Sequence, residues 1–331
     1  MTRVWSEGFE MRDLVGYTTS GGAGISTSVK RSGGASFYSF DWEYGYFNKS
    51  ITAVSELYLR FATYLDSTNI RTLYWYHDAT ELGHIHISTA GINISTNGLT
   101  DAGVHTLSSS TWLLIEVHIK IDDATGVVEV KYEGLAECDV SGDTKPGADT
   151  TVTSFRFASS GGSYTALYLD DMALNDTAGG VDDSWCGEGK IIMLYPNDDV
   201  TTELTQYPAL TDHHADVDDF PADGDTTYVQ GTVVDEEDLY ELTASGLVAA
   251  DVDTINRVWV ESRSKDTTAT GGTLLLFINS NGTVDDGPDV TLSTSYTKKI
   301  LSGEFLQNPD GPAAWSVAAL DALRAGVRTR S

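Results

Sequence analysis

Cysteine is scarce in this 331-residue sequence, which contains only Cys138 and Cys186. A small secreted domain held together by several disulfides is therefore excluded. The N-terminal residues MTRVWSEGFE lack the apolar stretch of a secretory signal, so we expect synthesis in the cytosol, or export without such a signal. The two cysteines can form at most one bridge, and in a chain of this kind we expect two free thiols.

Long apolar runs and basic residues are missing as well. No run approaches the roughly 18 apolar residues of a transmembrane helix, and 20 Lys and Arg against 49 Asp and Glu give a formal net charge of -29. Nucleic acids and anionic membranes attract clustered basic residues, so neither is an expected partner. Between Lys190 and Arg257 there are 16 acidic residues and no basic one. We interpret this stretch as a solvated acidic face, with cation binding as the alternative.

Few segments have the composition of a long helix, whereas glycine and aromatic residues are frequent, with 32 Gly and 10% aromatics. This balance is typical of all-β proteins. Around residues 112–134, apolar and polar residues alternate as in a strand buried on one face. The expected inner residues are Ile115, Val117, Ile119 and Ile121. Residues 127–133 repeat the pattern after a polar loop, which predicts an antiparallel hairpin with Lys120 opposite Glu129 on the outer surface.

This hairpin also carries a family resemblance. A tryptophan, a strand ending in Lys-Ile-Asp, a Thr-Gly turn and a strand ending in Gly resemble the laminin-G/concanavalin A-like jelly roll. Residues 6–10, SEGFE, resemble the first strand of that family, and residues 168–172, YLDDM, resemble its closing strand. The resemblance covers about residues 1–177 and implies an antiparallel β-sandwich. It implies architecture rather than activity, because lectins, glycoside hydrolases and structural modules share this fold.

The chain is longer than the roughly 250–300 residues at which a single hydrophobic core stops growing. We therefore predict an all-β protein of two domains: a jelly roll over 1–177 and a second, smaller β-sandwich over 190–331. The Gly- and Asp-rich residues 178–189 are the expected connection. Near the end, Ser316 is predicted to cap a short helix over 317–324 that stops before Gly326.

Residues 71–88 are the most aromatic and histidine-rich part of the first domain. Such rings can stack on a sugar, although alternation places about half of them in the core. His84 and His86 share one face of a predicted strand and could present two imidazoles to a metal, but a zinc site needs three or four ligands. The candidate carbohydrate-binding residues are Tyr74, Trp75, Tyr76, His84 and His86.

Two acidic loops are candidates for calcium, which prefers carboxylate and carbonyl oxygens. The spacing in the first loop matches no EF-hand, and the alternative for both is a solvated polar surface loop. No other cofactor is expected. The candidate ligands are Asp139, Asp143 and Asp149 in the first domain and Asp216, Asp218 and Asp223 in the second.

Three catalytic patterns are absent from the sequence. Glycoside hydrolases of this fold carry Glu-x-Asp-x-x-Glu on one strand, whereas here Glu116 and Asp122 are six residues apart. Neither a Gly-x-Ser-x-Gly elbow nor a phosphate-binding glycine loop occurs. The sequence therefore predicts a protein that is not an enzyme.

The order of three segments, 173–197, 213–229 and 308–328, resembles the C-terminal half of structural proteins encoded by tailed bacteriophages and prophages. This resemblance implies a virion structural protein on capsid or tail, assembled in the host cytoplasm as a homo-oligomer. Other virion proteins, and host surface glycans reached by the first domain, are the implied partners. The alternative is a carbohydrate-binding or carbohydrate-cleaving protein that uses the concave face of the jelly roll. The expected assembly contacts are Trp315, Leu320, Leu323 and Val327.

Overall fold

The computed structural model describes residues 3–20, 22–40, 45–65, 70–160, 166–209, 212–268, 271–300 and 305–330. The chain forms two compact units, Met1–Ile192 and Met193–Ser331. Within the described residues, the regular structure is antiparallel β apart from one short α-helix and two 3-10 turns. The all-β fold class is confirmed. Residues 178–189, the expected connection, lie inside the first unit, and the division falls after Ile192.

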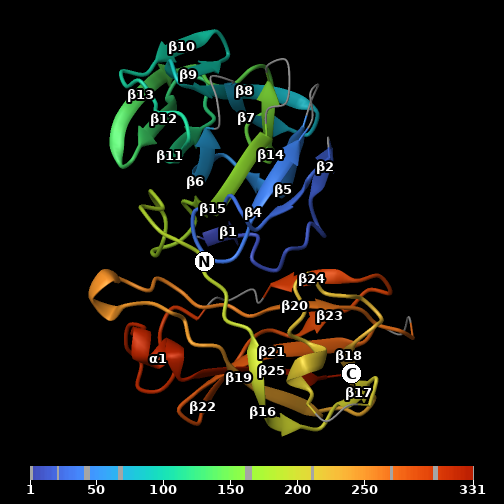
Figure 1. Ribbon diagram of the computed structural model, residues 1–331. Coiled ribbons are helices and arrows are strands. Elements are labelled where there is room, and N and C mark those ends of the chain that lie inside the picture. The colour runs from blue at the N-terminus through green and yellow to red at the C-terminus, as the bar shows by residue number, and fades with distance from the viewer. Residues whose placement is uncertain are drawn as a thin grey trace. The chain divides into compact units, whose positions relative to one another are not determined.

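The first unit is built from two antiparallel sheets (Figure 1). The order of the first sheet is β13 (Leu135–Gly142), β12 (Gly126–Tyr132), β11 (Thr111–Lys120), β6 (Glu56–Leu65), β15 (Ala166–Asp176), β4 (Ser36–Phe40) and β3 (Gly24–Ser26), with β1 (Arg3–Glu7) also paired to β15. The order of the second sheet is β10 (Leu99–Ala102), β9 (Gly91–Thr96), β8 (Thr80–Ser88), β7 (Ile70–His77), β14 (Val152–Ser160), β5 (Tyr46–Val54) and β2 (Thr18–Ser20).

The core of the first unit contains residues from both sheets. The four predicted inner residues of the hairpin are all buried in this core, which also contains Phe155 and Phe157 of β14 and Phe47 of β5. Full burial of a side chain of this size stabilises a fold by about 1.5–3 kcal/mol. The core therefore accounts for the stability that the surface pairs of the hairpin cannot supply.

The register of the central hairpin differs from the prediction by two residues. His118 lies opposite Glu129, and Lys120 lies opposite Val127, so the expected Lys120–Glu129 pair is wrong. The reason is the loop, in which Oδ1 of Asp122 accepts hydrogen bonds from the backbone N–H groups of residues 124 and 125, at 2.9 and 2.7 Å. This turn lets the strands begin to pair at Lys120 and Val127.

The outer face of the first sheet is partly covered by the segment 183–191. The Gly187 N–H donates to Oε1 of Glu116 at 2.7 Å, and the Trp185 ring lies 5.4 Å from the Tyr58 ring and 6.0 Å from the His118 ring. Glu116 and His118 are consequently 4% and 8% exposed, although the alternating pattern had placed them on an open surface. A polar residue on the outer face of a strand is therefore solvated only where no other segment covers it.

Both cysteines are buried and unbridged, as predicted. Burial raises the pKa of the Cys138 thiol to about 12 and also raises the pKa of Cys186. A thiol that is held protonated in the core is a poor nucleophile, so neither cysteine is suited to nucleophilic catalysis.

The second unit is a smaller antiparallel β domain. Its main sheet has the order β16 (Pro196–Thr202), β19 (Glu237–Leu242), β25 (Leu323–Thr329), β21 (Thr273–Ser280) and β22 (Thr283–Asp286), and β23 (Val290–Thr291) also pairs with β21. Two strand pairs accompany it: β17 (Thr205–Tyr207) with β18 (Tyr228–Gln230), and β20 (Glu261–Ser264) with β24 (Thr297–Ile300). The 3-10 turns are η1 (His214–Asp216) and η2 (Ala249–Asp251).

The helix of the second unit, α1 (Val317–Asp321), begins where the sequence predicted. Oγ of Ser316 accepts a hydrogen bond from the Ala319 N–H at 3.1 Å, which is the expected N-cap. The helix ends three residues early, because the chain enters β25 at Leu323. Among the described residues, no helix has the length and apolar character needed to cross a membrane.

Candidate functional site

Four ring side chains lie in succession on the outer face of the second sheet. Tyr74 and Tyr76 come from β7, and His84 and His86 come from β8. Ring centroids are separated by 6.1 Å between the two tyrosines, 5.4 Å between Tyr74 and His84, and 4.5 Å between the two histidines. All four side chains are half-buried. We call these residues the aromatic strip.

Trp75, the fifth predicted member of this group, faces the other way. It is fully buried in the core between the sheets, so its assignment to a surface platform is wrong. Trp75 lies opposite Gly83 of β8, and a Cβ atom at position 83 would overlap the indole ring. The tryptophan thus packs beneath the two strands that carry the aromatic strip, filling the space that the glycine leaves.

The register of five strands extends the site beyond the aromatic strip. One row across the sheet consists of Asn48, Arg156, Tyr74, His84 and Ser95. The neighbouring row consists of Tyr46, Ala158, Thr72, His86 and Asn93. These ten positions contain no Asp, Glu or Lys, in a chain with 49 acidic residues. These two rows are therefore lined by rings, amides and hydroxyls, with one arginine among them, while Glu81 lies opposite Tyr76 in the adjoining row.

Sequence reasoning missed Arg156 and Tyr46. The guanidinium of Arg156 lies over the Tyr46 ring, 3.9 Å from its centroid, and its charge counteracts part of the burial that raises the pKa of Tyr76. Arg156 stands between Phe155 and Phe157, which are both core residues. The alternation in the sequence SFRFA could have placed Arg156 on the outer face together with Tyr74.

Burial sets the protonation states in the aromatic strip. The pKa of His86 is lowered, first by burial and then by the neighbouring His84, while burial and then Glu81 raise the pKa of Tyr76. Both groups are consequently neutral near pH 7 and can donate as well as accept hydrogen bonds. Nδ1 of His86 lies 2.9 Å from Oγ1 of Thr72, and Nδ1 of His84 donates to Oε1 of Glu81 at 2.7 Å.

A second aromatic row crosses the outer face of the first sheet. The register places Trp112, Tyr64, Tyr168 and Tyr38 side by side, with ring centroids 5.7, 5.9 and 6.4 Å apart in that order. The next row toward segment 183–191 contains Leu114 and Ala62, both buried. The second aromatic row therefore has fewer polar neighbours than the aromatic strip, and it is the less suitable surface for a polar ligand.

The predicted calcium ligands are not brought together. Asp139, on β13, lies opposite Glu129 of β12, and Asp143 accepts a hydrogen bond from the Lys145 N–H. In the second unit, Asp216 is 3% exposed, Asp223 accepts from the Thr227 N–H, and the pKa of Asp218 is raised by burial. In the described part of the chain, no group of three His, Cys, Asp or Glu side chains has the geometry to hold a metal ion.

Three of the four expected assembly contacts are interior residues. Trp315, Leu320 and Leu323 are 5%, 7% and 3% exposed, and Nε1 of Trp315 donates to the carbonyl of Phe305 at 2.9 Å. They pack inside the second unit and cannot form a contact surface, so their assignment to assembly contacts is wrong. Val327 is half-buried on β25, which has a neighbouring strand on each side.

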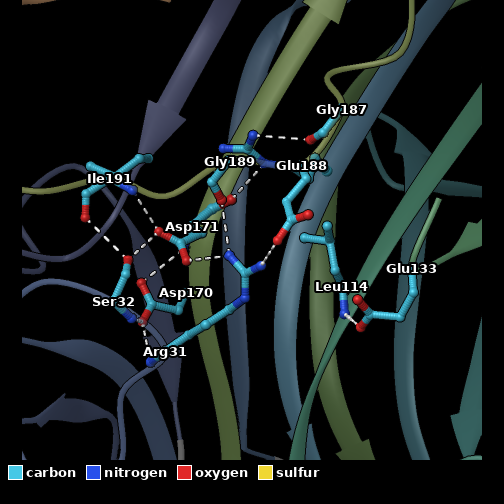
Figure 2. Close-up of polar contacts among 11 residues, drawn as sticks. Arg31, Ser32, Leu114, Glu133, Asp170, Asp171, Gly187, Glu188, Gly189 and Ile191 are labelled. Carbon is cyan, nitrogen blue, oxygen red and sulfur yellow. Dashed lines mark hydrogen bonds and ion pairs between the residues drawn. The ribbon is translucent and has the colours of Figure 1, made fainter. Parts of the chain in front are cut away.

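A buried polar network of the first unit lies at the register shift in β15, between Asp170 and Ala173. Figure 2 shows Asp171 bound to three groups: Nη1 of Arg31 at 2.7 Å, Oγ of Ser32 at 2.6 Å and the Ile191 N–H at 2.7 Å. The carboxylate of Asp170 accepts from the backbone N–H groups of Arg31 and Ser32. We call Asp170, Asp171, Arg31 and Ser32 the carboxylate clasp.

The carboxylate clasp contains one acid with a perturbed pKa, Asp170, but offers no access to a ligand. Burial and the neighbouring Asp171 raise the pKa of Asp170 to about 8, and burial raises the pKa of nearby Glu10 to about 7. Perturbed carboxyl groups often mark active sites, but both aspartates are 0% exposed. We interpret the clasp as an anchor that ties residues 189–191 to the jelly roll.

No family model and no curated protein matches this chain. Solved structures that resemble it include a sialidase, with 10% identity, a TM-score of 0.43 and coverage of 54% of this chain and 19% of that one. The carbohydrate esterase vb_24B_21 of the Shiga toxin-encoding bacteriophage phi24B has 12% identity, a TM-score of 0.36 and coverage of 48% and 89%. The Lotus tetragonolobus seed lectin has 10% identity, a TM-score of 0.37 and coverage of 51% and 97%. At these identities the likeness is one of fold alone.

Proposed function

We propose that the first unit binds a glycan on the outer face of its second sheet. The observation that carries this proposal is the aromatic strip, whose four rings are in contact and lie on or beside two outward rows that add amides, hydroxyls and one arginine. Sugars offer C–H faces that pack on aromatic rings and hydroxyls that need donors and acceptors. The neutral His86 and Tyr76 can serve as both donor and acceptor, which suits sugar hydroxyls.

The test is a glycan array probed with the full chain and with two alanine variants. Tyr74→Ala removes the central ring of the aromatic strip, and we expect it to abolish binding. Tyr64→Ala is the matched control, because Tyr64 is also a half-buried tyrosine on the outer face of a sheet, and this variant should bind as the wild type does. If Tyr64→Ala abolishes binding while Tyr74→Ala does not, the ligand lies on the first sheet and the proposal is wrong.

We further propose that this glycan-binding unit is part of a virion structural protein without catalytic activity, as the sequence resemblance implies. Supporting this, large apolar side chains exposed by more than a third lie mostly in the second unit among the described residues. They include Val200, Tyr207, Val233, Val234 and Val248. Many identical copies in a particle would convert weak contacts through such residues into avidity.

Two measurements test the virion and enzyme proposals separately. Immunogold labelling of intact phage particles should place the protein on capsid or tail, and unlabelled particles would contradict a virion role. Prolonged incubation with any glycan that the array identifies should release no shorter product. Formation of new reducing ends or unsaturated sugars would show that the protein is an enzyme.

A further inference from the structure

One cation lies on the proposed glycan-binding face. Cross-strand register places Arg156 between Asn48 of β5 and Tyr74 of β7. Its guanidinium stacks on the Tyr46 ring, 3.9 Å from the ring centroid. Contacts of this kind hold the planar group in one orientation, so little further entropy is lost when it binds a ligand.

Among the residues that the structure describes, no acid forms an ion pair with Arg156. Its ring contact is with Tyr46, and the Tyr76 phenol stays uncharged near pH 7 because burial raises its pKa. Nε of Arg156 is buried without a hydrogen-bond partner. Glu81, the acid opposite Tyr76 in the strand register, accepts a hydrogen bond from His84 at 2.7 Å.

From this geometry we infer that the ligand is an anionic glycan, whose carboxylate or sulfate group binds Arg156 while a sugar ring packs on the aromatic strip. This inference rests on the proposed function and adds the ligand class to it. A guanidinium matches the two oxygens of a carboxylate or sulfate group with parallel hydrogen bonds. A neutral glycan would displace water from the cation without supplying a counter-charge. This loss of hydration costs free energy and disfavours neutral ligands.

The overall charge of the chain makes this inference specific. With a net charge of -29, the protein repels anions at long range, so a general electrostatic attraction cannot collect an acidic glycan. Binding must depend on a short-range contact with a local cation. Replacing that one cation should consequently have a large effect, whereas replacing a cation elsewhere should have almost none.

The experiment compares three tetrasaccharides by titration calorimetry on the full chain: tetragalacturonate, a sulfated tetrasaccharide and neutral cellotetraose. We expect at least one anionic probe to bind tenfold or more tightly than cellotetraose, and the stronger of the two identifies carboxylate or sulfate as the anion. Arg156→Gln should weaken binding of that probe at least tenfold. Arg156→Lys should weaken it less, because lysine keeps the charge but loses the planar pair of donors.

Arg263→Gln provides the matched control. Arg263 lies in the second unit, where its guanidinium is 5.1 Å from the Tyr296 ring centroid, and the variant should bind as the wild type does. Melting temperatures verify that each variant is folded. The inference is overturned if neither anionic probe binds, if cellotetraose binds equally well, or if Arg156→Gln keeps its affinity. In each of these cases, the proposed function is still supported if the protein binds a glycan and Tyr74→Ala abolishes that binding.

Discussion

Replacement of Asp171 by Asn is the sharpest test of how residues 189–191 are held to the jelly roll. The Asp171 side chain is fully buried and is bound by the guanidinium of Arg31, the hydroxyl of Ser32 and the N–H of Ile191. The Arg31 side chain is itself only 11% exposed. Asparagine keeps the shape of the side chain but removes its charge and one of its two acceptor oxygens.

The expected loss follows from the burial of both partners. Removing one member of a buried ion pair costs roughly 3–5 kcal/mol, since the other charge is left without its counter-ion. Arg31 retains the carbonyl of Gly189 at 2.9 Å and the carboxylate of Glu188 at 3.5 Å. Because these contacts remain, we expect about 3 kcal/mol for Asp171→Asn, the lower end of that range.

Urea unfolding of the full chain, followed by tryptophan fluorescence, measures this loss. The signal reports mainly on the first unit, which contains five of the seven tryptophans. Glu188→Gln is the matched control, because Glu188 also pairs with Arg31 but its side chain is 76% exposed. Such a surface pair contributes less than about 1 kcal/mol. If the two variants lose the same stability, the argument from burial is refuted.

Three further predictions concern the pH dependence, packing and metal binding of the protein. Burial raises the pKa of Glu10 to about 7, so the first unit should lose stability as the pH rises from about 4 to 7. The free energy of unfolding, measured at pH 4 and at pH 8, gives the size of this loss. In the Glu10→Gln variant the loss should be smaller by up to roughly 3 kcal/mol. Gly83→Ala places a methyl group against the Trp75 ring and should lower the free energy of unfolding in urea by about 1–3 kcal/mol. Gly180→Ala is the control, because a methyl group there would have nothing within 4 Å, and it should leave the free energy of unfolding nearly unchanged. Because we expect no bound calcium, melting temperatures in NaCl and CaCl₂ at matched ionic strength should agree. A rise of several degrees specific to calcium would contradict this expectation.

The sequence predicted the first sheet well because its central strands follow one strict period. The inner residues of β11 alternate without interruption, and all of them are in the core. The same period could not locate the covering segment 183–191, whose hydrogen bond from Gly187 to Glu116 joins residues 71 positions apart. It also could not fix the hairpin register, which depends on the local hydrogen bonds of Asp122 in the loop.

The site was predicted in part for a similar reason. Alternation assigns Tyr74 and Tyr76 to one face and Trp75 to the other, but it does not say which face is the core. That choice depends on partner strands, here on Gly83 and on the phenylalanines of β14. Because Arg156 lies 82 residues after Tyr74 in the chain, only the pairing of β14 with β7 reveals that they are neighbours.

The two outer faces of the jelly roll differ in structure, so the proposed glycan binding can be tested separately from stability. Segment 183–191 covers part of the first sheet through Trp185 and Gly187 and is tied down by the carboxylate clasp. The rows of the second sheet keep half-buried rings that remain open to a ligand. Since Asp171 belongs to the first sheet and Arg156 to the second, substitutions there should have opposite effects. Asp171→Asn should lower stability and leave glycan affinity unchanged well below its melting temperature, whereas Arg156→Gln should do the reverse.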